Sequence, residues 1–156
     1  MKNTLLLMGI ICILFSCKNK TDSNIAVNST HENAKTPTLE GVWELVGYYN
    51  YVDNKINDST RTNENRKQVK IYTKNKVMWS KKRVPDSTEW FAYGSYTIAD
   101  NILTENLEYA SKTMDKALEE SPEFKYELIV TDSTFSQIEI DENNQRFYSE
   151  NYKRIE

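Results

Sequence analysis

From Leu39 onward the chain alternates short runs of strand-forming residues with brief polar links, and this spacing constrains the fold more than any other feature. The runs are rich in Val, Ile, Thr, Tyr, Phe and Trp, the residues that favour β-strands. Links such as Lys74-Asn75 and Asp132-Ser133 contain residues that tolerate turn conformations. Links this short connect antiparallel neighbours, because parallel strands need a much longer crossover. The predicted strands are 41–52, 67–73, 76–83, 90–98, 102–110, 124–131, 134–141 and 146–155.

Eight consecutive antiparallel strands predict an all-β fold, an eight-stranded up-and-down β-barrel. Residues 53–66 are polar and are expected to form a long loop. Residues 111–120 carry Met114, Ala117 and Leu118 at helical spacing, which predicts one short amphipathic helix between the fifth and sixth strands. A barrel of this size is either filled by its own side chains or holds one small ligand.

The N-terminus is typical of a secretory signal. Lys2 supplies a positive charge and residues 4–16 form an apolar run. As a helix this run would extend about 20 Å, short of the roughly 30 Å of a bilayer's hydrocarbon core. The run ends in Leu14-Phe15-Ser16-Cys17, which resembles the lipobox of bacterial lipoproteins. The resemblance implies cleavage before Cys17 and acylation of that cysteine; an ordinary signal peptide or an uncleaved anchor is the alternative.

The predicted organisation therefore has three parts. Residues 1–16 are a lipoprotein signal peptide, residues 17–38 are the lipidated Cys17 and a disordered tether, and residues 39–156 are the barrel domain. The tether is polar and cannot bury enough apolar surface to offset its ordering entropy. Lys18 follows the cysteine, and this resembles lipoproteins that are passed to the outer membrane. We therefore expect a lipid-anchored protein of the cell envelope, in the outer membrane.

The scarcity of His and Cys excludes several kinds of chemistry. The single histidine, His31, lies in the tether, and both cysteines, Cys12 and Cys17, lie in the N-terminal segment. Residues 39–156 therefore offer no Cys/His zinc site, no catalytic cysteine and no His-dependent base. We expect no metal, no cofactor and no enzymatic activity. Nucleic acid is also not expected as a partner of an exported chain with a net charge of −3.

Charge is distributed unevenly along the predicted barrel. Lys and Arg gather in residues 61–83, whereas residues 84–156 are strongly acidic. We interpret the basic hairpin as a solvated surface. Contact with anionic lipid headgroups or with an anionic ligand is the alternative.

Side-chain alternation predicts which residues face the barrel interior, because successive strand residues point to opposite sides. Polar residues at 104, 106 and 108 mark the solvated face of strand 102–110, and the same test applies to the neighbouring strands. The predicted inward aromatic residues are Trp79, Trp90, Tyr96, Tyr109 and Tyr126; Tyr148 joins them as a candidate although its strand is ambiguous. Ile98 is also expected to face inward. These aromatic residues either line a ligand pocket or form the core.

Glu105 is the one charged residue on the inward face of strand 102–110. A buried carboxylate costs several kcal/mol unless it is paired or hydrogen-bonded. The candidate partners are Tyr96, Tyr109, Tyr126, Arg146 or a donor on a ligand. Glu105 is therefore either a structural staple between strands or a polar anchor for a ligand.

Gly41-Val42-Trp43 opens the first strand, and Tyr152-Lys153-Arg154-Ile155 closes the last one. This pair of motifs resembles the calycin superfamily, and more closely the bacterial lipocalin-like domains. In that family a Trp plugs one barrel end and a late Arg packs over its indole. The resemblance implies that Trp43 and Arg154 close the barrel in the same way.

Two functions follow from these observations. The leading hypothesis is a membrane-anchored, lipocalin-like lipoprotein that binds a small apolar or amphipathic molecule among Trp79, Trp90, Tyr96, Glu105, Tyr109, Tyr126 and Tyr148. The alternative is a filled barrel that binds an envelope protein. A catalytic use of Glu105 with tyrosines is a weaker third idea. The volume of the barrel interior distinguishes the first two: ligand pockets usually measure about 300 Å³ or more, and an interior cavity below about 100 Å³ would count strongly against the first.

Overall fold

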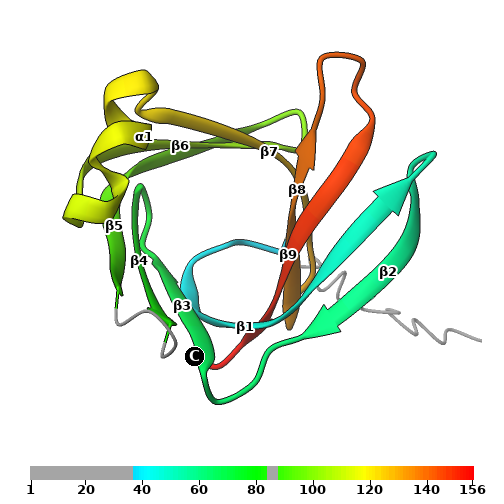
Figure 1. Cartoon of the computed structure of the whole chain (residues 1–156), viewed down its shortest axis with the longest axis horizontal. Helices are drawn as coiled ribbons and strands as arrows, with labels where there is room; N and C mark the ends of the chain where they lie inside the picture. Colours follow the sequence, from blue (N-terminus) through cyan, green and yellow to red (C-terminus); the bar gives the residue numbers. More distant parts are fainter. Residues whose placement is uncertain (1–36, 84–87) are drawn as a thin grey trace, which may run out of the picture. The chain divides into compact units, whose positions relative to one another are not determined.

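The computed structural model describes residues 37–83 and 88–156, and these form the predicted antiparallel β-barrel (Figure 1). The predicted signal segment, Cys17 and the tether up to residue 36 lie outside the described residues. Among the described residues the strands are β1 (Gly41–Val52), β2 (Lys55–Arg61), β3 (Arg66–Tyr72), β4 (Lys76–Arg83), β5 (Thr88–Ala99), β6 (Ile102–Ala110), β7 (Glu123–Val130), β8 (Thr134–Ile140) and β9 (Arg146–Arg154). The predicted fold class is confirmed.

Strand β1 closes the barrel because it pairs on both of its edges. Its first residues pair with β3, from Gly41 opposite Tyr72 to Glu44 opposite Val69. Its other edge pairs with β9, from Trp43 opposite Arg154 to Asn50 opposite Tyr148. Strands β3 to β9 pair consecutively, so β1 and β3–β9 form the eight-stranded ring.

The long loop predicted at 53–66 is wrong, because it contains strand β2. Asp53 and Asn54 both have positive φ, at 50° and 60°, and they turn β1 back into β2 as a tight hairpin. Beyond Glu44, β1 leaves β3 and pairs with β2 instead. The turn signal Asp-Asn was present in the sequence, but the strand that follows it is polar and fully exposed, so composition did not reveal it.

The predicted helical segment is confirmed as a 3₁₀ turn, η1 (Lys112–Met114), followed by helix α1 (Asp115–Glu120). It lies over the barrel end beside β5, β6 and β7 (Figure 1). Met114 is its buried residue and packs with Ala92 and Leu107. In the part of the chain that the structure describes, we find no helix with the length and apolar character needed to cross a bilayer.

One end of the barrel is closed by Trp43 and Arg154. Trp43 is fully buried, its indole Nε1 donates to the Leu39 carbonyl at 2.7 Å, and its ring meets Phe135 edge-on at 4.9 Å. The Arg154 guanidinium lies 4.0 Å from the Trp43 ring centroid. Gly41 has φ of 135°, and a Cβ there would collide with Arg154. The structure therefore shows the contact implied by the two terminal motifs, together with the reason for a glycine two residues before the tryptophan.

Candidate functional site

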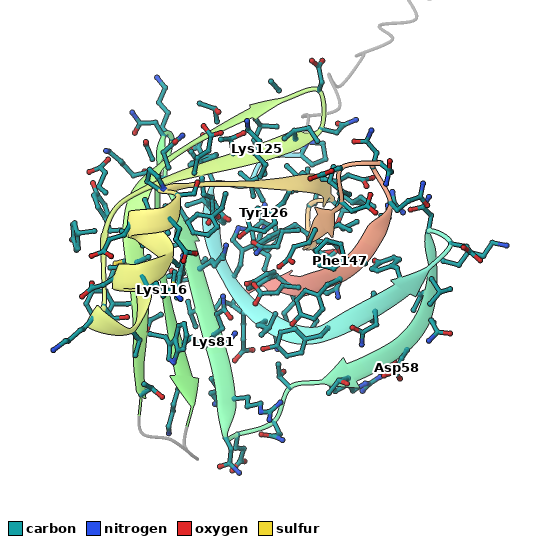
Figure 2. All side chains as sticks on the ribbon, turned by 45° about the horizontal axis from the view of Figure 1, so that its top comes forward. Asp58, Lys81, Lys116, Lys125, Tyr126 and Phe147 are labelled. Atoms are coloured by element: carbon teal, nitrogen blue, oxygen red, sulfur yellow. The ribbon has the colours of Figure 1, made fainter. Side chains whose placement is uncertain are left out.

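The opposite half of the barrel contains a cavity of about 290 Å³. Its apolar wall comes from β4, β5, β6, η1 and β7, in the form of Trp79, Trp90, Leu107, Met114 and Phe124. Its polar lining consists of Gln68, Lys70, Lys81, Glu105, Tyr126, Gln137, Glu139 and Glu150. In Figure 2 the labelled Lys81 and Tyr126 lie toward the barrel interior, whereas Lys116 and Asp58 lie on its outside. The cavity is therefore amphipathic.

A buried ion pair forms the centre of the polar lining. Lys70 Nζ lies 2.9 Å from Glu105 Oε1, and both side chains are 2% exposed. Lys70 also donates to Gln137 Oε1 at 2.6 Å, and the Tyr72 hydroxyl donates to Glu105 Oε1 at 2.5 Å. Burial and the adjacent Glu105 carboxylate raise the pKa of Tyr72, so this hydroxyl stays protonated and remains a donor. The desolvation cost of the two charges is thus offset by mutual attraction and further hydrogen bonds.

A second carboxylate, Glu150, is joined to this pair through Gln137. The Gln137 amide accepts from Lys70 and donates to Glu150 Oε2 at 3.1 Å. The Tyr152 hydroxyl donates to the same oxygen at 2.5 Å, and Lys81 Nζ lies 3.6 Å from Glu150 Oε1. We call Gln68, Lys70, Glu105, Gln137 and Glu150 the polar belt. It crosses the barrel between the closed end and the cavity.

Three polar groups at the cavity have no partner among the described residues. Gln68 Oε1 and Trp90 Nε1 are buried without a hydrogen bond. The Gln68 amide nitrogen is already used, because it donates to the Tyr152 hydroxyl at 2.9 Å. Glu139 is half-buried, and desolvation followed by the nearby Glu150 charge raises its pKa. Since buried polar groups are nearly always paired, the two buried atoms indicate where a ligand could supply hydrogen bonds, and Glu139 adds a half-buried carboxylate at the same cavity.

A second pocket, of about 320 Å³, opens where β1 leaves β3. Tyr48 and Tyr148 stack there with ring centroids 5.6 Å apart. Lys81 Nζ lies 5.7 Å from the centroid of the Tyr48 ring. Lys81 lines both pockets and therefore lies between them.

The structure distributes the predicted ligand-binding residues among four places. Trp79, Trp90, Glu105 and Tyr126 line the cavity. Tyr148 lines the second pocket. Tyr96 faces inward but belongs to the closed half, where it meets Tyr72 at 5.0 Å and donates to the Thr73 carbonyl at 2.8 Å. Tyr109 lies on the outer surface.

The predicted inward direction of Tyr109 is wrong because of a β-bulge. The register between β5 and β6 shifts from Leu107 opposite Gly94 to Tyr109 opposite Tyr93, which leaves Glu108 as an extra residue. Such a residue reverses the alternation beyond it. Tyr109 is consequently 58% exposed and stacks on Tyr93 at 5.3 Å. The predicted burial of Ile98 is also wrong, because Ile98 is 45% exposed at the end of β5, two residues before the Asp100 turn.

The partners expected for Glu105 are wrong, because the structure pairs it with residues of β3. Arg146 pairs with Glu127 instead, and Glu105 is held by Lys70 and Tyr72. Lys70 was counted with the solvated basic hairpin, which is wrong for this residue. A signal for it was available: the short Lys74-Asn75 link sets a register in which Lys70 stands opposite the inward Trp79. Gln68 and Gln137 were missed for the same reason, because polar residues were assigned to the outer face.

The described residues contain no group of His, Cys, Asp and Glu that could hold a metal ion. Their polar atoms at the cavity are amide, indole, phenol, ammonium and carboxylate groups. This set favours recognition of a ligand by hydrogen bonds and charge, with aromatic surface for its apolar part.

Comparison with known proteins shows which fold this barrel resembles. No protein-family model and no curated protein matches the chain. Among solved structures it is similar to a lipocalin-like protein from Bacteroides uniformis, with 13% identity and a TM-score of 0.51 over 75% of this chain and 98% of that one. An uncharacterized protein from Bacteroides eggerthii gives 15% identity and a TM-score of 0.47 over 74% and 98%. The first likeness shows a lipocalin-like barrel fold.

Proposed function

We propose that this protein is a membrane-anchored, lipocalin-like lipoprotein whose barrel binds a small amphipathic molecule. The cavity of about 290 Å³ carries the proposal. The cavity is partly open to solvent, and its volume lies at the lower end of the range of about 300 to 1,000 Å³ that is usual for ligand pockets. A space of this size, with an aromatic wall and a polar belt, supports one small ligand.

The filled-barrel alternative has less support. It expects a fully packed interior. Ala92, Leu107 and Met114 pack together beside the cavity, but Trp79 and Trp90 are only partly buried around it. Binding of an envelope protein therefore has no specific feature in its favour.

A structural role suits Glu105 better than a catalytic one. Glu105 is 2% exposed and is engaged by the Lys70 ammonium and the Tyr72 hydroxyl. A general acid or base must reach the proton it transfers. With its charge compensated inside the protein, Glu105 acts as a staple that shapes the cavity floor.

Binding of N-phenyl-1-naphthylamine, a small apolar fluorophore, tests the cavity. The full chain in nonionic detergent is compared with Leu107→Phe, which fills the cavity, and with Ile129→Phe, which adds the same ring on the exposed outer face. We expect one saturable site in the wild type and in Ile129→Phe, and at least tenfold weaker binding in Leu107→Phe. Equal binding by all three chains would contradict a ligand site inside the barrel.

We also propose that Cys17 carries the lipid anchor at the outer membrane, on the strength of the lipobox-like end of the apolar run. Stable attachment needs more than one acyl chain, which lipoprotein processing would supply at this cysteine. Labelled fatty acid should enter the wild type and Cys12→Ser, and should not enter Cys17→Ser. Incorporation into Cys17→Ser, or normal processing of it, would exclude the lipoprotein assignment.

A further inference from the structure

The cavity has an excess of negative charge that the protein does not compensate. Glu105 is matched by Lys70 at 2.9 Å. Glu150 is matched by Lys81 at 3.6 Å and by the Tyr152 hydroxyl and Gln137 amide. Glu139 forms no ion pair and no hydrogen bond in the described part of the chain; Tyr148 stands opposite it on β9. The charged groups lining the cavity therefore leave one carboxylate unmatched.

The two lysines are not available to neutralise it. Lys70 is held between Glu105 and Gln137 and lies 5.8 to 5.9 Å from three tyrosine rings. Lys81 lies between Glu150 and the Tyr48 ring at the entrance of the second pocket. An acidic ligand would therefore meet Glu139 and Glu150 without an unpaired lysine among the residues that line the cavity; Arg66 lines the neighbouring second pocket.

The unpartnered Gln68 oxygen is an independent observation that points to a donor on the ligand. Gln68 is 4% exposed and its Oε1 atom has no hydrogen bond. Its amide nitrogen already donates to Tyr152 and reaches Glu150 at 3.4 Å, so exchanging the two amide atoms would place oxygen against that carboxylate. A buried acceptor without a hydrogen bond destabilises the folded protein, and a donor group on a bound ligand would remove that penalty.

We infer that the ligand is an amphiphile with an alkylammonium head, whose apolar tail lies against Trp79 and Trp90 and whose N–H groups serve Glu139 and the Gln68 oxygen. This assignment rests on the proposed binding function and specifies its ligand class. An ammonium group supplies three donors and one positive charge, which matches one unpaired carboxylate and one unpaired acceptor. A carboxylate head of equal length would instead add like charge.

Three probes of equal chain length test the assignment: octylamine, 1-octanol and octanoate. Their affinities for the full chain are measured at neutral pH by displacement of N-phenyl-1-naphthylamine, and Leu107→Phe is measured alongside to subtract binding to detergent. We expect octylamine to bind at least tenfold more tightly than octanoate, with octanol between them. Glu139→Gln should lower the octylamine affinity to about that of octanol and leave octanol unchanged. Glu142→Gln, an exposed turn residue with the same loss of charge, is the control and should change nothing.

The outcomes separate this inference from the proposed function. Octanoate binding as tightly as octylamine would overturn the ammonium assignment and leave the ligand cavity standing. An equal loss of octylamine affinity in Glu142→Gln and Glu139→Gln would also overturn it, because long-range charge would then explain the preference. If the fluorophore and all three probes fail to bind, the proposed function falls as well. The ranking on the wild-type chain decides the question even where Glu139→Gln does not fold.

Discussion

The two ends of this barrel differ in how completely they satisfy their own polar groups. At the closed end the Trp43 indole N–H meets a carbonyl at 2.7 Å, and the Arg154 guanidinium donates to the carbonyls of Thr38, Glu40 and Asp132. At the open end a second tryptophan, Trp90, has its N–H buried without a partner in the described residues. Tryptophan thus has a satisfied N–H group within the packed core at one end and an unsatisfied N–H group at the cavity at the other. The contrast predicts that substitutions cost stability at the closed end and ligand affinity at the open end.

The largest effect is expected from the two tryptophans. Trp43→Ala should lower the free energy of unfolding by about 3–5 kcal/mol, because it removes a fully buried ring that closes the barrel. Trp90→Ala removes a partly exposed ring at a space that is already open, and should cost less than half as much. Chemical denaturation of both variants measures the difference. Equal costs would mean that the two ends are equally structural, and a cost under about 1 kcal/mol for Trp43→Ala would remove its role as a plug.

The polar belt should give the next largest effect. Glu105→Gln should destabilise the ligand-free protein by about 1–3 kcal/mol, because Lys70 keeps its charge and loses its partner. The double substitution Lys70→Met with Glu105→Leu removes both charges and should recover most of that loss, since apolar replacement of a buried pair is often neutral. Denaturant melts of the three proteins test this staple role. A Glu105→Gln protein as stable as the wild type would show instead that the partner of Glu105 arrives with the ligand.

Arg154→Lys tests the contacts that the guanidinium group makes at the closed end. Lysine keeps the charge but cannot reproduce a planar group that covers the Trp43 ring at 4.0 Å and donates to three carbonyls. We expect a loss of about 1–2 kcal/mol in the free energy of unfolding. Arg146→Lys, which changes a partly exposed pair with Glu127, is the control and should cost roughly 0.5 kcal/mol or less. Similar losses in both variants would show that the contact with Trp43 adds no more to the free energy of unfolding than a surface ion pair does.

The smallest effect is a pH dependence at the open end. Desolvation and Glu150 raise the pKa of Glu139 above its usual value of 4.5, so the folded state binds this proton more readily than the unfolded state. Stability therefore falls as pH rises from about 4.5 through the raised pKa, and the penalty is complete above it. Glu139→Gln should melt slightly higher than the wild type above this window and equally below it. A difference in melting temperature that does not vary with pH would place its cause outside the ionisation of Glu139.

The strands, turns and closure could be predicted from sequence because each depends on local signals. The Asp100-Asn101 turn has φ of 51° and 61°, which Asp and Asn tolerate, and it joins two strands whose composition is unambiguous. Alternation placed Trp79, Trp90 and Tyr126 at the cavity for a similarly local reason. These features require no knowledge of distant parts of the chain.

The site needed information that composition does not carry. The bulge at Glu108 reverses the direction of Tyr109, and nothing in the local residues announces the extra position. Lys70 is charged and still only 2% exposed. Its ammonium group donates a hydrogen bond to the carboxylate of Glu105, which lies 35 positions further along the chain. Rules that send charged residues to solvent fail where a partner from another strand offsets the desolvation cost. The polar belt therefore cannot be predicted from local sequence patterns, because it depends on contacts between strands that are distant in the sequence.

The pairing of β1 with β9 also determines when the structure can form. The hydrogen bond from Arg154 to the Thr38 carbonyl joins residues 116 positions apart, so the ring is completed only after nearly the whole domain has been synthesised. Contacts this distant in sequence slow folding, because loop-closure entropy is lost before the contact forms. A nascent or truncated chain without β9 would expose the unpaired edges of β1 and β8, both of which are templates for aggregation. Pairing of the last strand thus converts an open sheet with two unpaired edges into a closed barrel.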